Sequence, residues 1–268
     1  MYICTNSCLK NKKLMKIALV QADLIWENTD ENLKNFEAKI NDLASNTDLI
    51  VLPEMFSTGF TMHPQKVAES ENGKTVLWMI QTAVRTQKAI TGSLVIEENG
   101  NYYNRLFFVF PDGTYKKYNK RHLFSLAGEH HNYTAGKEKL IVRYKDWNIC
   151  LLVCYDLRFP VFSRNTEQSD LLIYVANWPT KRIEAWDILL KARAVENMVY
   201  TIGVNRVGTD KNQNEYSGHS QIIDYLGKYI IEPQTLEGNF YATLDKKPQN
   251  EIREKLGFLN DRDRFTID

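Results

Sequence analysis

The sequence predicts an α/β fold with two sheets and more strand than a simple doubly wound sheet contains. Two observations support this prediction. In the first part of the chain, short apolar runs alternate with segments whose apolar side chains recur at helical spacing. Further along, β-rich segments follow one another across turn residues, which indicates added hairpins. The chain has 268 residues, 43% of them hydrophobic, and can therefore form a substantial core.

Three strands and two helices are expected first. The strands cover the apolar runs Lys16–Ala22, Asp48–Leu52 and Ala89–Ile96. One helix follows Thr29 and carries Leu33, Phe36, Ile40 and Leu43; the other covers Lys74–Lys88 and carries Leu77, Ile80 and Val84 on one stripe. This order, strand and helix in alternation, indicates helices packed against a sheet.

Hairpins dominate the middle of the chain. Tyr103–Phe110 and Thr114–Tyr118 are joined by the turn signal Pro111-Asp112-Gly113, and Leu140–Tyr144 pairs with Asn148–Cys154. The remaining elements are a strand at Asp170–Ala176, a helix at Ile183–Asn197, a strand at Met198–Asn205, and strands near Gly218–Ile223, Tyr229–Glu232 and Gly238–Leu244. No repeat or flexible linker divides the chain, so we expect residues 15–268 to form one domain.

Charge and hydropathy exclude two classes of partner. The net charge is 34 − 33 = +1, with acids and bases interleaved, so no basic field is present to attract nucleic acid. The longest apolar runs, such as Ile149–Cys154 and Leu171–Ala176, are far shorter than the roughly 20 residues needed to cross a membrane. Neither nucleic acid nor a membrane is therefore expected as a partner.

The first residues and the cysteines indicate a reducing location. Residues 1–14 lack the apolar stretch and cleavage site of a signal peptide, and we expect them to be a disordered or over-extended leader before a functional start at Met15. Cys4, Cys8, Cys150 and Cys154 form neither a disulfide framework nor a zinc-binding spacing. A cytoplasmic protein is the expectation.

Three segments carry side chains suited to catalysis. Cys154 and Glu54 each follow an apolar strand, at the end where active-site groups commonly converge. Lys120 lies in a basic cluster after a hairpin, and an ammonium group near Cys154 would lower the thiol pKa and stabilise an oxyanion. Taken singly, each has an ordinary alternative: an inert core cysteine, a solvated or helix-capping glutamate, and a solvated charged face.

Together these segments resemble the nitrilase superfamily of carbon-nitrogen hydrolases. The matching fragments are Leu52-Pro53-Glu54, Tyr118-Asn119-Lys120-Arg121-His122-Leu123-Phe124 and Val153-Cys154-Tyr155-Asp156-Leu157-Arg158-Phe159-Pro160. Further segments, among them Tyr174-Val175-Ala176-Asn177-Trp178-Pro179, are most similar to bacterial omega-amidases of the YafV type. The resemblance implies a four-layer α-β-β-α sandwich that forms a homodimer and uses neither a metal nor an organic cofactor.

The resemblance also implies the roles of individual residues. Glu54, Lys120 and Cys154 would form a catalytic triad, with Glu129 beside them, and the backbone N–H of Tyr155 would help to bind the oxyanion. Omega-amidases hydrolyse the terminal amide of monoamides such as 2-oxoglutaramate and 2-oxosuccinamate. Substituting Cys154 or Lys120 is expected to remove or weaken this activity and to leave the fold intact.

A substrate with a far carboxylate requires a cation and an apolar wall. Arg158 is the first candidate for the cation, unless it pairs with Asp156 or another acid. Phe124, Tyr133 and Trp178 are candidates for the wall, although aromatic residues beside strands more often belong to the core.

Other functions remain open from the sequence. A papain-like protease would pair Cys154 with His219, but the local signature of that class is missing. A nitrilase, a carbamoylase, an acyltransferase or a different aliphatic amidase would use the same triad, and a non-catalytic interaction protein could keep the same fold. The apolar residues of Ile183–Asn197 either form part of a homodimer interface or pack only on the sheet.

Overall fold

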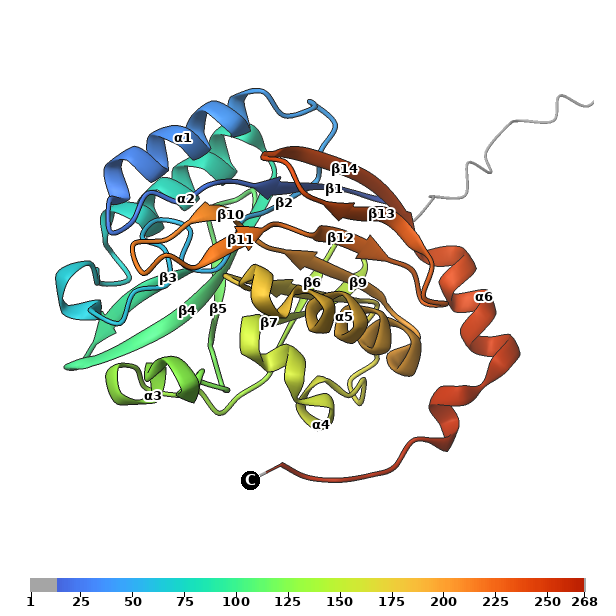
Figure 1. Cartoon of the computed structure of the whole chain (residues 1–268). Helices are drawn as coiled ribbons and strands as arrows, with labels where there is room; N and C mark the ends of the chain where they lie inside the picture. Colours follow the sequence, from blue (N-terminus) through green and yellow to red (C-terminus); the bar gives the residue numbers. More distant parts are fainter. Residues whose placement is uncertain (1–13, 268) are drawn as a thin grey trace, which may run out of the picture.

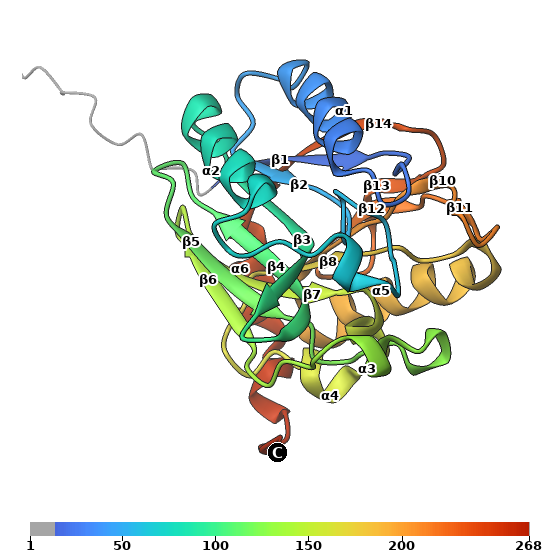
Figure 2. The same ribbon diagram turned by 90° about the vertical axis from the view of Figure 1, so that its left-hand side faces the viewer.

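The computed structural model describes residues 14–267 and contains two six-stranded sheets that pack face to face (Figures 1 and 2). The first sheet has the order β14-β1-β2-β3-β4-β5, and the second has the order β13-β12-β9-β8-β7-β6. Strand β1 lies against β9, and β4 lies against β7. Helices α1 and α2 cover the outer face of the first sheet, and α5 covers the second. The predicted four-layer α-β-β-α sandwich is therefore confirmed.

The first sheet is formed by β1 (Leu14–Gln21), β2 (Leu49–Val51), β3 (Ala89–Glu98), β4 (Asn101–Val109), β5 (Tyr115–Asn119) and β14 (Gly238–Asp245). The second is formed by β6 (Leu140–Tyr144), β7 (Trp147–Val153), β8 (Leu171–Val175), β9 (Tyr200–Val204), β12 (Ser220–Ile223) and β13 (Tyr229–Gln234). A separate hairpin joins β10 (Val207–Thr209) to β11 (Glu215–Ser217). In each sheet three central strands run parallel, β1-β2-β3 and β7-β8-β9.

The helices are α1 (Thr29–Asn41), α2 (Lys74–Thr86), α3 (Glu129–Asn132), α4 (Pro160–Ser163), α5 (Ile183–Asn197) and α6 (Lys246–Leu256). Short 3-10 turns cover η1 (Pro64–Lys66), η2 (Ser125–Ala127), η3 (Cys154–Arg158), η4 (Thr180–Arg182) and η5 (Phe258–Asp261). None of the helices in residues 14–267 has the length and apolar character needed to cross a membrane.

Strand β1 shows why its sequence is continuously apolar. Ile17 and Leu19 face the core between the sheets, whereas Ala18 and Val20 face the core beneath α1 and α2. Successive side chains of a strand point to opposite faces, so a strand covered on both sides needs apolar residues at every position.

Two sequence predictions need correction. On α2 the predicted stripe is not the buried one: Leu77 and Val84 are exposed, and Val76, Met79 and Ala83 are buried under the helix instead. The predicted leader also ends one residue earlier, because Leu14 belongs to β1 and pairs with Asp245. The rest of that leader, residues 1–13, lies outside the described residues.

Helix α5 lies unusually close to the second sheet at Gly203. A Cβ atom at Gly203 would lie 2.5 Å from the side chains of Leu190 and Trp186 on α5. Only glycine leaves room for this approach, which brings the start of α5 close to the ends of β8 and β9.

Candidate active site

Glu54 lies just beyond β2, fully buried, with its carboxylate held from three sides. Its Oε1 accepts hydrogen bonds from the Nζ of Lys120 at 2.9 Å and the Nδ2 of Asn104 at 2.7 Å. Its Oε2 accepts the backbone N–H of Asn177 at 2.8 Å. Three donors therefore fix the orientation of this carboxylate in a site without solvent access.

Lys120 directly follows β5, and its buried ammonium group lies between two carboxylates. In addition to Glu54, it donates to Glu129 Oε1 at 3.0 Å and Oε2 at 2.9 Å. Burial opposes its charge, but Glu129 and then Glu54 outweigh that effect and raise the pKa of Lys120 above its usual value. The lysine is therefore a fixed positive charge and cannot serve as a base.

Glu129 is the first residue of α3 and follows Gly128, which has a φ of +76°. Its Oε2 also accepts the backbone N–H of Phe124 at 2.5 Å. Burial raises the pKa of Glu129 above its usual value, against the opposing charge of Lys120, and Glu54 adds to the increase.

Cys154 forms the turn between β7 and η3, and its backbone is strained. Its φ is +45°, in the left-handed region that non-glycine residues rarely adopt. Burial, and then the carboxylate of Glu54, raise the pKa of the Cys154 thiol well above its usual value, and Lys120 offsets only part of this effect. A hydrogen bond to Glu54 adds to the increase. The resting group is thus a thiol in contact with a base.

Asp156 joins the cysteine turn to the lysine segment. Its carboxylate accepts the backbone N–H of Val153 at 2.9 Å, the hydroxyl of Tyr118 at 2.7 Å and the backbone N–H of His122 at 3.1 Å. The acceptors of Asp156 are therefore used to position Cys154 and Lys120 relative to each other, and Arg158 is not its partner.

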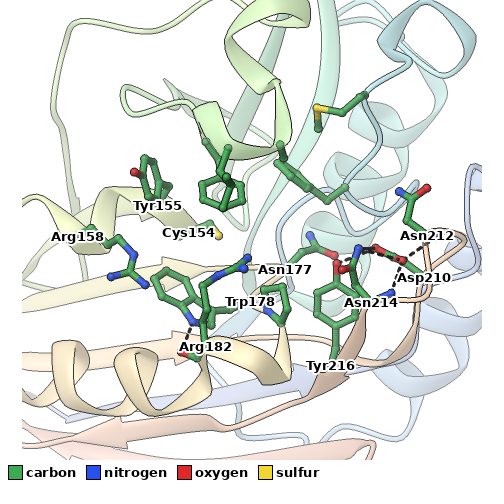
Figure 3. Close-up of a pocket in the computed structure, with 16 residues that line it drawn as sticks. Cys154, Tyr155, Arg158, Asn177, Trp178, Arg182, Asp210, Asn212, Asn214 and Tyr216 are labelled. Atoms are coloured by element: carbon green, nitrogen blue, oxygen red, sulfur yellow. Dashed lines mark hydrogen bonds between the residues drawn. The ribbon is translucent and has the colours of Figure 1, made fainter.

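A cavity of about 330 Å³ opens beside Cys154 (Figure 3). It is lined by Phe60, Met62, Phe124, Leu126, Ala127, Cys154, Tyr155, Arg158, Asn177, Trp178, Pro179, Arg182, Asp210, Asn212, Asn214 and Tyr216. Its size suits a small molecule, and its apolar surface with a few convergent polar groups is typical of ligand sites.

Three of the four residues proposed for substrate contact line this cavity. Phe124 and Trp178 form apolar parts of its wall, and the guanidinium group of Arg158 lies over the Trp178 ring at 5.0 Å. Tyr133 does not line it: its hydroxyl donates to the carbonyl of Thr61 at 2.8 Å, in a small core cluster. Tyr133 is thus a core residue behind the site, as aromatic residues beside strands often are.

Several residues of the site were not identified from the sequence. Asn177 follows β8 and donates through Nδ2 to the carbonyl of Glu54 at 2.6 Å. Its place after an apolar strand, the same as that of Glu54 and Cys154, was the available signal. The polar residues Asp210, Asn212, Asn214 and Tyr216 come from the β10–β11 hairpin, which no periodicity predicted. Arg182 comes from η4, just before α5.

His219 does not take part in this arrangement. Its Nδ1 lies 2.8 Å from Asp187 Oδ2 of α5, and it does not line the cavity beside Cys154. A cysteine–histidine pair of the papain type is therefore absent from the part of the chain that the structure describes. Within those same residues, no group of three or more His, Cys, Asp or Glu side chains is arranged to hold a metal ion.

The fold and the site together define a hydrolase of carbon–nitrogen bonds. A family model described as carbon-nitrogen hydrolase matches residues 16–253, and the chain belongs to this family. This confirms the resemblance to the nitrilase superfamily that the sequence motifs indicated.

Individual relatives cover almost the whole chain. Omega-amidase YafV of Yersinia enterocolitica is 43% identical over 256 residues, which are 94% of this chain and 98% of the relative. The 2-oxoglutaramate amidase of Bacillus subtilis is 32% identical over 91% of this chain and 96% of its own length. The crystal structure of XC1258 from Xanthomonas campestris, a CN-hydrolase superfamily protein with an arsenic adduct in its active site, has a TM-score of 0.93 and 40% identity. It matches 95% of this chain and 99% of that one.

Proposed function

We propose that the protein is an omega-amidase, which hydrolyses the terminal amide of small dicarboxylic acid monoamides such as 2-oxoglutaramate or 2-oxosuccinamate. The observation that carries this proposal is the contact of the Cys154 thiol with the carboxylate of Glu54, beside Lys120 and at a cavity of substrate size. The relatives named omega-amidase and 2-oxoglutaramate amidase support the choice of substrate class.

In the first half of the reaction, Glu54 takes the thiol proton of Cys154, and the thiolate attacks the amide carbonyl. The raised pKa of the thiol supports this order, because the proton must be removed by a base at the moment of attack. Lys120 and the backbone N–H of Tyr155 stabilise the oxyanion of the tetrahedral intermediate.

In the second half, protonated Glu54 gives its proton to the amide nitrogen, the C–N bond breaks and ammonia leaves a thioester on Cys154. Glu54 then removes a proton from water, which attacks the thioester and releases the carboxylic acid. The sum is one amide and one water converted to one acid and one ammonia. Glu129 serves to position Lys120, through the two hydrogen bonds that hold the ammonium group.

The substrate class is tested by ammonia release from a panel of small amides. We expect higher kcat/KM for 2-oxoglutaramate and 2-oxosuccinamate than for glutamine, asparagine or simple nitriles. Preferred turnover of nitriles or N-carbamoyl compounds would instead assign another activity of the same superfamily. Absence of ammonia from every compound, together with no covalent labelling of Cys154, would favour a non-catalytic interaction protein.

We also propose that the protein forms a homodimer through the outer face of α5. Ile188 and Val195 on this face are 66% and 51% exposed, and Leu226 beside them is 45% exposed. Apolar side chains gathered in this way are commonly covered by a partner. Light scattering at micromolar protein is expected to give twice the chain mass of 31.2 kDa, and a monomeric mass would contradict the dimer.

Two further proposals complete this assignment. Residues 15–268 form one catalytic domain, because both sheets contribute to the same site. The protein works in the cytoplasm, where reducing conditions keep the Cys154 thiol available for catalysis.

A further inference from the structure

We propose that Arg182 binds the carboxylate at the far end of the substrate and is the residue that selects amides carrying such a group. This inference rests on the omega-amidase function proposed above and names a specificity residue for it. It is carried by the position of Arg182, by its lack of an acidic partner and by its burial relative to Arg158.

Arg182 is held in place by its surroundings and points into the cavity. It ends η4, and its backbone carbonyl accepts the Nε1–H of Trp178 at 2.8 Å. Its guanidinium group lies over the ring of Phe124 at 5.1 Å. Figure 3 shows this side chain directed into the cavity on the side of Cys154. Stacking on a ring leaves the N–H groups at the edge of the guanidinium plane free for a planar anion.

The cavity contains positive charge without a matching negative partner. Within residues 14–267, no carboxylate lies within 4.0 Å of the guanidinium nitrogens of Arg158 or Arg182. Asp210 is the single acidic residue in the lining, and its carboxylate already accepts from the backbone N–H groups of Asn212 and Asn214 and the hydroxyl of Tyr216. An incoming carboxylate would thus supply the missing partner of the arginines.

Burial distinguishes the two arginines. Arg158 is exposed, whereas Arg182 is half-buried in the wall. A charge pair is stronger where water is partly excluded, so a carboxylate gains more from Arg182 than from Arg158 at the solvent-exposed side. Arg182 is therefore assigned the main role in selecting the substrate and Arg158 a supporting one.

The test compares two substrates of equal length, 2-oxoglutaramate and the neutral amide pentanamide. For Arg182→Leu, which keeps the apolar stem but removes the charge, kcat/KM for 2-oxoglutaramate is expected to fall about 10- to 100-fold, mainly through KM. Turnover of pentanamide should change by less than about twofold, because that substrate makes no charged contact. Arg182→Lys should retain more activity toward 2-oxoglutaramate than Arg182→Leu.

Two controls separate the possible failures. Arg143→Leu removes an exposed arginine of β6 and should leave both substrates unaffected. Competitive inhibition by the product 2-oxoglutarate should weaken in Arg182→Leu by the same factor as the substrate, even if pentanamide is turned over slowly. Equal losses for both substrates, or no loss for either, would overturn the role of Arg182 alone. A wild-type protein inactive toward every dicarboxylic monoamide would overturn the proposed function itself, and with it this inference.

Discussion

Cys154→Ala is expected to abolish amide hydrolysis and to leave the protein folded. Without the sulfur no thioester forms, and loss of a nucleophile typically lowers kcat by about 10⁴-fold or more. Alanine fits the space of the thiol, and the left-handed backbone at this position, with a φ of +45°, is no more strained for alanine than for cysteine. The measurements are ammonia release from 2-oxoglutaramate and the thermal unfolding midpoint.

Cys150→Ala provides a matched control for this experiment. Cys150 lies four residues earlier in β7, is buried and does not line the cavity. Burial raises its pKa to about 12, so it is not a competing nucleophile. This variant should keep its activity and still react with an alkylating agent at Cys154. A folded Cys154→Ala protein with wild-type activity would rule out the proposed mechanism.

Lys120→Met is expected to lose both activity and stability. Removal of the ammonium group takes away the oxyanion contact, which costs about 100-fold or more in kcat. It also leaves Glu54 and Glu129 buried without their positive partner, a change that typically costs about 3–5 kcal/mol of unfolding free energy. The sequence alone predicts that the fold survives loss of this lysine unharmed, and the two buried carboxylates change that expectation.

The stability loss in Lys120→Met should depend on pH, with a definite sign. Lys120 lowers the pKa of Glu129, which burial holds above its usual value, so removing the lysine raises that pKa further. A carboxyl group with a raised pKa in the folded state favours folding at low pH, and this contribution is lost as the pH rises through the raised pKa. Urea unfolding should therefore show a larger difference between wild type and variant at pH 8 than at pH 5.

Lys117→Met is the control for this substitution. Lys117 also belongs to β5, but it forms exposed ion pairs with Glu71 and Glu98. Exposed pairs contribute about 0–1 kcal/mol, so the control should stay close to wild type in stability and activity. Equal unfolding free energies for Lys120→Met and Lys117→Met at pH 8 would contradict the importance of the buried cluster.

Much of the fold could be predicted because buried strands and helices have clear patterns. The helix α5 has the bounds that the sequence indicated, Ile183–Asn197, and the strands agree within a few residues. Helix α6 was not predicted, because it is polar and is held by hydrogen bonds, such as that from Gln249 to the carbonyl of Asp170 at 2.8 Å. On α2, apolar residues occupy both the buried and the exposed face, so spacing alone could not identify the buried stripe.

The site could be predicted in part, for a related reason. Glu54 and Cys154 each follow a buried strand, and the structure brings both together with Lys120 and Glu129. The wall formed by the β10–β11 hairpin could not be predicted, because polar turn residues carry no sign of which surface they will face. For Tyr133, the sequence could not separate a pocket residue from a core residue, since both positions favour aromatic side chains.

The reacting groups come from both halves of the sandwich. Glu54 and Lys120 follow strands of one sheet, whereas Cys154 and Asn177 follow strands of the other. Neither half of the polypeptide can be catalytically competent alone, and the proton donor and its acceptor meet only after the two halves have docked. Activity is consequently a property of the completed assembly of layers, and a small slip of one layer over the other would silence the enzyme well before it unfolds.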